Sequence, residues 1–174
     1  PRLYWSMSAA QCLGGIPVPM YQDSVADELQ YVVEHAEVRF AVVEDQEQVD
    51  KLLEIMDRCP KLEFIIYCNP RGMRNYSQDF LIDLETVQQK GKDFESKNTA
   101  FFSDEIDKGK SGDVACILYT SGTTGDPKGV VLSHESLIKT ATNAANWDQL
   151  TADGNVLAYL PMAWVGDNLF SYSE

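Results

Sequence analysis

Hydrophobic positions in the first 20 residues repeat with the period of a helix and then stop. Leu3, Met7 and Ala10 fall on one helical face, and Gly14–Gly15 is a natural end for that helix. The next segment, IPVPM at 16–20, must be extended because proline fixes φ and restricts the residue before it. The pattern therefore predicts a helix followed by an extended segment.

The following 50 residues alternate between helical and strand periods. Ser24 stands three residues before Asp27, a capping-box spacing, and opens a helical stripe. Asp45 is placed to cap the next stripe. The first stripe comprises Val25, Leu29, Val32, Val33 and Ala36, and the second Val49, Leu52, Leu53 and Met56. Short apolar runs at 39–45 and 62–68 predict buried strands.

This order of strands and helices indicates a parallel sheet with right-handed crossovers. Beyond it, apolar positions between Phe80 and Val87 predict one more helix, and residues 91–112 read as a solvated connection. Farther along, the pattern predicts a central strand at 114–120, a short strand at 129–133, a helix capped by Ser133 and a buried strand at 155–161. We therefore predict an α/β fold of layered parallel-sheet subdomains flanked by helices.

The charge of the chain restricts its partners. The formal net charge is −13 at pH 7, which argues against nucleic acid and against an anionic membrane surface, since both are bound through clustered Lys and Arg. Hydrophobic content of 44% is that of a globular protein. Because the chain starts at Pro1 and stops inside an unfinished segment at Glu174, we expect a fragment of a larger protein.

The cysteines and the apolar start of the chain bear on location. No CxxC occurs, so the four cysteines are expected to be buried thiols in a reducing compartment, and a zinc site is not expected with only two histidines. Residues 3–22 carry no charge, but their glycines, prolines and polar side chains do not suit a membrane span or a signal peptide. We predict no transmembrane segment and a cytoplasmic location.

The stretch with the clearest chemistry is YTSGTTGDPKGVVLSH at 119–134. It holds six hydroxyl side chains, three glycines and a single lysine, Lys128, between two apolar runs. Glycines allow backbone N–H groups to approach an anion, hydroxyls add donors, and lysine supplies a mobile positive charge. A loop beyond the end of a buried strand is also where α/β proteins bind ligands. The composition favours a cradle for a triphosphate.

This stretch has three other interpretations. It departs from the P-loop pattern, because Pro127 precedes Lys128 and Gly129 follows it, so an ordinary NTPase or kinase is disfavoured. A polar hairpin loop with a turn at Asp126 is the plain structural alternative. A hydrolase using Ser133 and His134 is disfavoured, because adjacent residues rarely form a nucleophile–base pair.

The same stretch resembles the phosphate-loop signature of the adenylate-forming enzymes, which include acyl-CoA synthetases, luciferases and peptide-synthetase adenylation domains. In that signature a run rich in hydroxyls and glycines leads to Pro-Lys-Gly, a short strand and a helix. Segments 8–45 and 157–170 resemble flanking regions of these enzymes, and YLPMAW at 159–164 resembles long-chain acyl-CoA synthetases, with Trp164 at the usual histidine position. The matching residues of the signature are Thr120, Ser121, Gly122, Thr123, Thr124, Gly125, Pro127, Lys128, Gly129 and His134.

The resemblance implies ATP, Mg²⁺, coenzyme A and a fatty acid as cofactors and substrates. Residues 120–125 and Lys128 would bind the phosphates, with Lys128 stabilising charge in the reaction and Thr120 reaching a phosphate-bound Mg²⁺. Trp164 would lie at the acyl pocket, although a core position for this ring is the alternative. The resemblance also implies part of a large N-terminal domain, with portions at 1–112 and 113–174, and an absent C-terminal domain.

The implied reaction converts a long-chain fatty acid to acyl-AMP and then to acyl-CoA, with release of pyrophosphate and AMP. Since other family motifs would lie downstream of Glu174, we expect these residues alone to be inactive. Two alternatives remain open: a non-catalytic module that binds a nucleotide or partner, and a ligase that passes the acyl group to a carrier protein. A homodimer and peripheral contact with a membrane also remain open.

Overall fold

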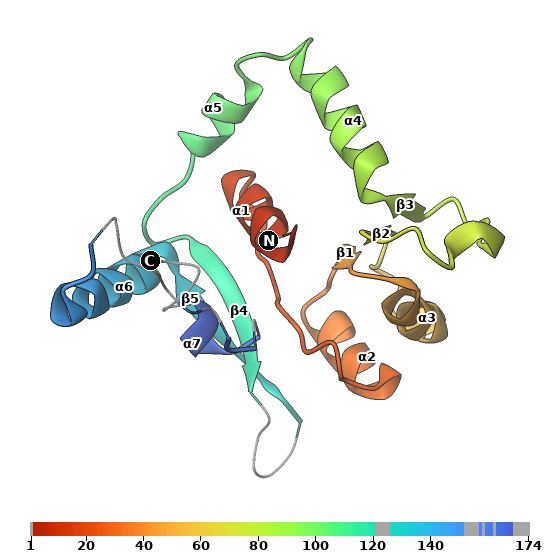
Figure 1. Cartoon of the computed structure of the whole chain (residues 1–174), viewed down its shortest axis with the longest axis horizontal. Helices are drawn as coiled ribbons and strands as arrows, with labels where there is room; N and C mark the ends of the chain where they lie inside the picture. Colours follow the sequence, from red (N-terminus) through yellow and green to blue (C-terminus); the bar gives the residue numbers. More distant parts are fainter. Residues whose placement is uncertain (1, 121–125, 152–156, 158, 162, 169–174) are drawn as a thin grey trace. The chain divides into compact units, whose positions relative to one another are not determined.

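The computed structural model describes residues 2–120, 126–151, 157, 159–161 and 163–168. The chain forms two compact units, and helix α1 (Arg2–Cys12) contributes to both (Figure 1). The first unit comprises residues 1–6 and 22–104, and the second comprises residues 7–21 and 105–174. Residues that are neighbours in sequence therefore do not always share a unit.

The first unit is a parallel three-stranded sheet with helices packed against it. The sheet has the order β1-β2-β3, with Phe40 opposite Phe64 and Ile65 opposite Leu81, so the predicted parallel sheet is confirmed. Helices α3 and α4 pack against β2. The elements are α2 (Ala26–His35), β1 (Phe40–Val43), α3 (Gln46–Ile55), η1 (Met56–Arg58), β2 (Phe64–Tyr67), η2 (Met73–Asn75), β3 (Leu81–Asp83) and α4 (Leu84–Glu95).

The predicted apolar stripes contribute to the core of this unit. Asp45 caps α3 as expected, accepting a hydrogen bond from the Gln48 amide at 3.4 Å. The buried face of α3 differs from the predicted one. Ile55 is buried, whereas Leu53 and Met56, which the pattern predicts in the core, are half-buried. Val25 of the first stripe is 58% exposed, and the predicted members that are buried are Leu29, Val32, Val33, Val49 and Leu52.

Three expectations for this unit were wrong. Helix α2 is capped at Val25 rather than Ser24, because the Glu28 carboxylate accepts from the Val25 amide at 3.4 Å. Residues 81–83 form strand β3 and not the start of a helix, since β2 offers them a pairing edge. The connection at 91–112 is exposed as expected, but it contains the end of α4 and helix α5 (Phe101–Ile106).

The second unit is built on a two-stranded antiparallel sheet. Strand β4 (Val114–Thr120) pairs with β5 (Lys128–Ser133), and α6 (His134–Asp148) follows directly. The short helix α7 (Val165–Asp167) comes last. The predicted strands at 114–120 and 129–133 and the helix after Ser133 are confirmed.

The expected buried strand at 155–161 is not formed by its described residues. Leu157 and Tyr159 are 80% and 75% exposed, and neither belongs to a strand. An apolar run becomes a buried strand only where a neighbouring strand and a covering layer are available. The described residues supply neither for this segment.

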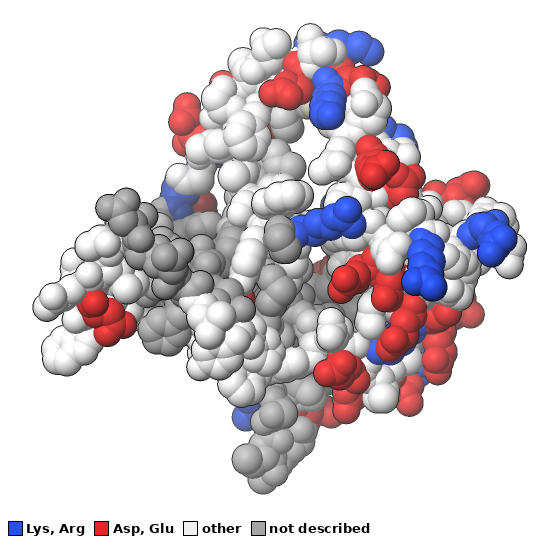
Figure 2. Space-filling model, viewed as in Figure 1, with Lys and Arg blue, Asp and Glu red and all other residues white. Residues whose placement is uncertain are grey.

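Acidic side chains gather over helices α2 and α3, as Figure 2 shows. Residues 22–58 contain eleven Asp or Glu and three Lys or Arg. All three bases are held in ion pairs: Arg39 with Glu63 at 2.7 Å, Lys51 with Glu47 at 3.0 Å and Arg58 with Asp27 at 3.0 Å. Such an acidic surface repels phosphate backbones.

Candidate phosphate-binding site

The hydroxyl-rich stretch joins two paired strands. Thr120 ends β4, Lys128 begins β5, and these two residues are the last cross-strand pair before the connection. The candidate residues Ser121, Gly122, Thr123, Thr124 and Gly125 lie outside the described residues. Of the predicted phosphate ligands, the structure therefore brings Thr120 and Lys128 together.

A small apolar core supports this hairpin. Ala115 and Cys116 are fully buried on β4, and Leu118 is 4% exposed. Leu137 from α6 joins them, with Leu132 of β5 packed against the cluster. Ala115, Cys116 and Leu118 of β4 therefore lie in this core, whereas Ile117 and Tyr119 are half-buried.

The segment after α1 runs beside β4 and is bonded to it. The Ile117 amide donates to the Pro17 carbonyl at 3.1 Å, and the Gln11 side-chain amide donates to the Ala115 carbonyl at 2.9 Å. The prolines keep residues 16–20 extended, as the sequence predicted, which allows this pairing. Strand β4 is therefore held from both sides, by β5 and by residues 11–17.

Thr120 and Lys128 share one face of the hairpin, because cross-strand partners in an antiparallel pair project to the same side. Both residues are exposed. Among the described residues, no carboxylate forms an ion pair with Lys128. A hydroxyl and a lysine ammonium beside each other on an accessible strand end form a donor set that suits a phosphate oxygen.

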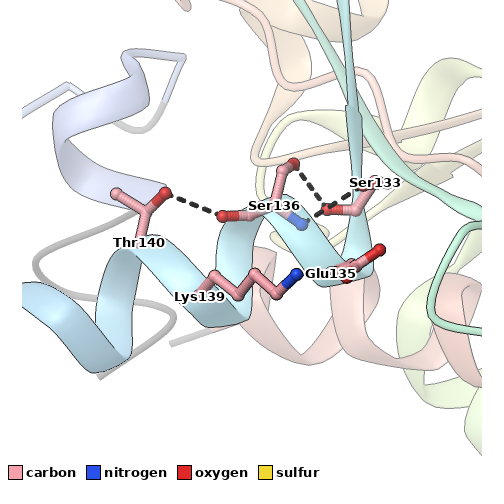
Figure 3. A network of polar contacts seen from close by, with 5 residues as sticks. All are labelled: Ser133, Glu135, Ser136, Lys139 and Thr140. Atoms are coloured by element: carbon pink, nitrogen blue, oxygen red, sulfur yellow. Dashed lines mark hydrogen bonds and ion pairs between the residues drawn. The ribbon is translucent and has the colours of Figure 1, made fainter.

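The first turn of α6 is held by its own side chains (Figure 3). Ser133 Oγ accepts from the Ser136 amide at 3.2 Å, so Ser133 caps the helix as predicted. Ser136 Oγ donates to the Ser133 carbonyl at 2.9 Å, and Thr140 Oγ1 donates to the Ser136 carbonyl at 2.7 Å. The Ser133 hydroxyl therefore has a structural role as a helix cap. This role gives no support to the hydrolase alternative.

Burial sets the ionisation of the thiol under the hairpin. Removal from water disfavours the thiolate and raises the pKa of Cys116 to about 11. All four cysteines are free, with Cys59 and Cys116 buried and Cys12 and Cys68 half-buried. The thiols are thus packed side chains, as expected, and Cys116 is not a nucleophile for the chemistry of the loop.

Trp164 precedes α7 and is 50% exposed. Its amide donates to the Pro161 carbonyl at 2.9 Å. A fully packed core position, the alternative weighed for this ring, does not describe its environment in the described residues. The role of Trp164 at an acyl pocket stays a prediction.

The described part of the chain holds no group of three or more His, Cys, Asp or Glu side chains able to bind a metal ion. None of its helices has the length and apolar character needed to cross a membrane.

Comparison with known proteins decides the family. The sequence profile described as AMP-binding enzyme matches residues 1–172. The chain belongs to this family. Among its AMP-binding relatives, the long-chain-fatty-acid–CoA ligase ACSBG2 of Xenopus laevis is 32% identical over 157 residues, which cover 87% of this chain and 20% of that protein. Long chain acyl-CoA synthetase 3 of Arabidopsis thaliana is 30% identical over 180 residues, covering 97% and 26%.

Solved structures confirm the fold class. ATP-bound MatB from Rhodopseudomonas palustris matches with a TM-score of 0.67 and 21% identity, over 98% of this chain and 30% of its own. FadD1 from Archaeoglobus fulgidus, a long-chain-fatty-acid–CoA ligase, matches with a TM-score of 0.64 and 20% identity, over 93% and 29%. The chain spans about a fifth to a quarter of the length of the curated relatives named above.

Proposed function

We propose that these residues are the phosphate-binding part of a protein that activates a long-chain fatty acid with ATP and transfers it to coenzyme A. The observation that carries the proposal is the pairing of Thr120 with Lys128 at the base of a hydroxyl- and glycine-rich loop, in a chain of the AMP-binding family. Support for the substrate comes from relatives named as long-chain-fatty-acid–CoA ligases.

The reaction proceeds in two steps. A carboxylate oxygen attacks the α-phosphorus of ATP, the bond to the bridging oxygen breaks, and pyrophosphate leaves. The thiol of coenzyme A then attacks the acyl carbonyl, loses its proton, and AMP leaves. Lys128 would stabilise negative charge that grows on the leaving pyrophosphate, and the loop would hold the phosphates in line for the attack.

Magnesium fits this arrangement only together with the phosphates. The described residues have no acidic cluster for a metal, whereas exposed Thr120 offers a hydroxyl at the end of β4. Bound Mg²⁺ would neutralise part of the triphosphate charge. We further propose a cytoplasmic location, supported by four free cysteines and no disulfide between them.

The test measures pyrophosphate release by the whole protein with ATP, Mg²⁺ and palmitate, with and without coenzyme A. We expect palmitoyl-CoA as product, and we expect Lys128→Ala to lower kcat by on the order of 100-fold, because one preorganised charge is lost at the transition state. Lys139→Ala is the matched control, since this exposed lysine of α6 pairs with Glu135 away from the loop.

Each contrary outcome points to a different protein. Acyl-AMP without thioester would indicate a ligase that serves a carrier protein. Absence of turnover with every carboxylic acid offered would indicate a module that only binds a nucleotide or partner. Equal activity of Lys128→Ala and Lys139→Ala would remove Lys128 from the mechanism.

A further inference from the structure

Gly129 stands beside Lys128 at a position where a side chain has no room. Gly129 pairs with Tyr119 across the hairpin, directly inside the Thr120–Lys128 pair. A Cβ at position 129 would lie 2.9 Å from Ile117 Cγ2 and 3.2 Å from Tyr119 Cζ. Ile117 and Tyr119, two residues apart on β4, together occupy the space that a side chain at 129 would need.

The glycine is required for space and not for backbone conformation. The glycines with positive φ among the described residues are Gly14 and Gly72, so Gly129 has a backbone that any residue can adopt. A larger residue would have to displace the Tyr119 ring or the Ile117 side chain. Ile117 is next to buried Cys116 and Leu118, so its movement would disturb the core under the hairpin.

We propose that the packing of Tyr119 and Ile117 over Gly129, here called the Tyr119–Gly129 contact, is a positioning device for the phosphate site. It fixes the separation and twist of β4 and β5 at the cross-strand pair next to Thr120 and Lys128, and it lies on the opposite face from both. The contact would set where the Lys128 ammonium and the Thr120 hydroxyl meet the phosphates, without touching the nucleotide. This inference rests on the proposed function and adds positioning residues to that same site.

A Cβ at 2.9 Å from a carbon atom is too close by several tenths of an ångström, so the strands or the ring must shift. Lys128 is adjacent in the strand and follows any such shift. Misplacement of a charged group by about 1 Å can lower a rate on the order of 100-fold.

The experiment compares Gly129→Ala, Ile117→Ala and the double variant in the whole protein, with Gly91→Ala as the control. A Cβ at Gly91, on exposed helix α4, would meet nothing within 4 Å. We expect Gly129→Ala to raise KM for ATP on the order of 10-fold while KM for coenzyme A is unchanged. Ile117→Ala should make room for the new methyl group and recover most of that loss in the double variant.

Two further measurements keep the inference testable if Gly129→Ala folds poorly. Tyr119→Phe keeps the ring and should keep KM for ATP, whereas Tyr119→Ala should raise it. Amide hydrogen exchange of residues 114–133, which needs no activity, should be faster in Gly129→Ala than in Gly91→Ala. A merely structural glycine would lower the melting temperature and the active fraction but leave KM for ATP unchanged.

The outcomes separate the two proposals. If the unchanged protein forms no acyl-adenylate and binds no ATP, both the proposed function and the positioning role are wrong. If it is active and Gly129→Ala has the KM for ATP of Gly91→Ala, the proposed function stands and the positioning role is wrong. The positioning role would also be wrong if Gly129→Ala folds but the added Ile117→Ala change does not bring its KM for ATP back toward that of the unchanged protein.

Discussion

Cys116 shows how packing in the hairpin sets the reactivity of one side chain. Its side chain is fully buried between Ala115 and Leu118 in the cluster that α6 covers through Leu137. Removal from water raises the pKa of its thiol to about 11, above the ordinary value of 9.0. The same packing that fixes β4 thus keeps this sulfur unreactive.

We expect Cys116 to resist a thiol reagent in the folded protein. At pH 8 about 0.1% of this thiol would be ionised even where the reagent could reach it. Iodoacetamide labelling followed by peptide mass spectrometry should modify half-buried Cys12 first and Cys116 only after unfolding in urea. Labelling of Cys116 at the rate of Cys12 would show that the hairpin core opens readily.

At this scale the sequence identified candidate ligands but not their geometry. Thr120 and Lys128 were both predicted to bind phosphate, and their residue types carried that prediction. Their pairing across two strands depends on the register of β4 and β5. The position of Tyr119 over Gly129 likewise becomes visible only once that register is known.

Helix α4 illustrates how the residue before a helix sets where that helix begins. Asp83 ends β3 and caps α4, accepting from the Thr86 hydroxyl at 2.6 Å and from the Thr86 amide at 2.8 Å. The apolar spacing of Phe80, Leu81, Leu84 and Val87 fits one helical face, which is why the sequence predicted a helix across β3. A strand of three residues is too short to show a period of two in the sequence. The pairing with β2 makes residues 81–83 a strand.

Substitution of this cap should weaken the protein in a pH-dependent manner. Hydrogen bonds from Thr86 lower the pKa of Asp83 below its ordinary value of 3.8. The carboxylate therefore stabilises the fold above pH 3.8, and this contribution is lost as the pH falls through the lowered pKa. Asp83→Ala should cost about 1 kcal/mol in the free energy of unfolding at pH 7.

Urea unfolding at pH 7 and at pH 2.5 measures this effect. The difference between the unchanged protein and Asp83→Ala should shrink at the lower pH. Asp79→Ala, a change at an exposed carboxylate just before β3, is the control and should have little effect at either pH. A difference for Asp83→Ala that is equal at both pH values would contradict a role for the carboxylate.

At the scale of the whole molecule, the stretch that lies between β3 and β4 in sequence is poorly protected. Residues 91–104 are all exposed, and neither α4 nor α5 contains a buried residue. Phe94 and Phe101 contact each other edge to face with ring centroids 5.0 Å apart, while remaining 48% and 39% exposed. Few buried contacts mean a low free energy of local opening.

Trypsin should therefore cut this stretch first. Lys92 and Lys97 lie in exposed backbone with little to unfold before cleavage. Lys51 is the internal control, since its side chain is 20% exposed, pairs with Glu47 and donates to the Gln22 carbonyl at 2.8 Å. Mass spectrometry of a brief digest reads the order of cuts, and early cleavage after Lys51 would contradict the expected ranking.

The sequence by itself determined the local elements and the chemistry of the loop. Apolar periods, caps at Asp45 and Ser133, and prolines at 17 and 19 act over a few residues, so they can be recognised without a fold. The hydroxyls, the glycines and Lys128 likewise predict phosphate binding by their residue types and spacing.

Only the tertiary structure decided what depends on partners distant in the chain. Residues 7–21 join the unit of the hairpin because the backbone beside Pro17 and the side chain of Gln11 bond to β4, about 100 residues away in sequence. The partner of β4 is antiparallel β5, and β3 exists because β2 pairs with it. Backbone groups must be satisfied by whichever neighbour the fold supplies, and no local pattern names that neighbour.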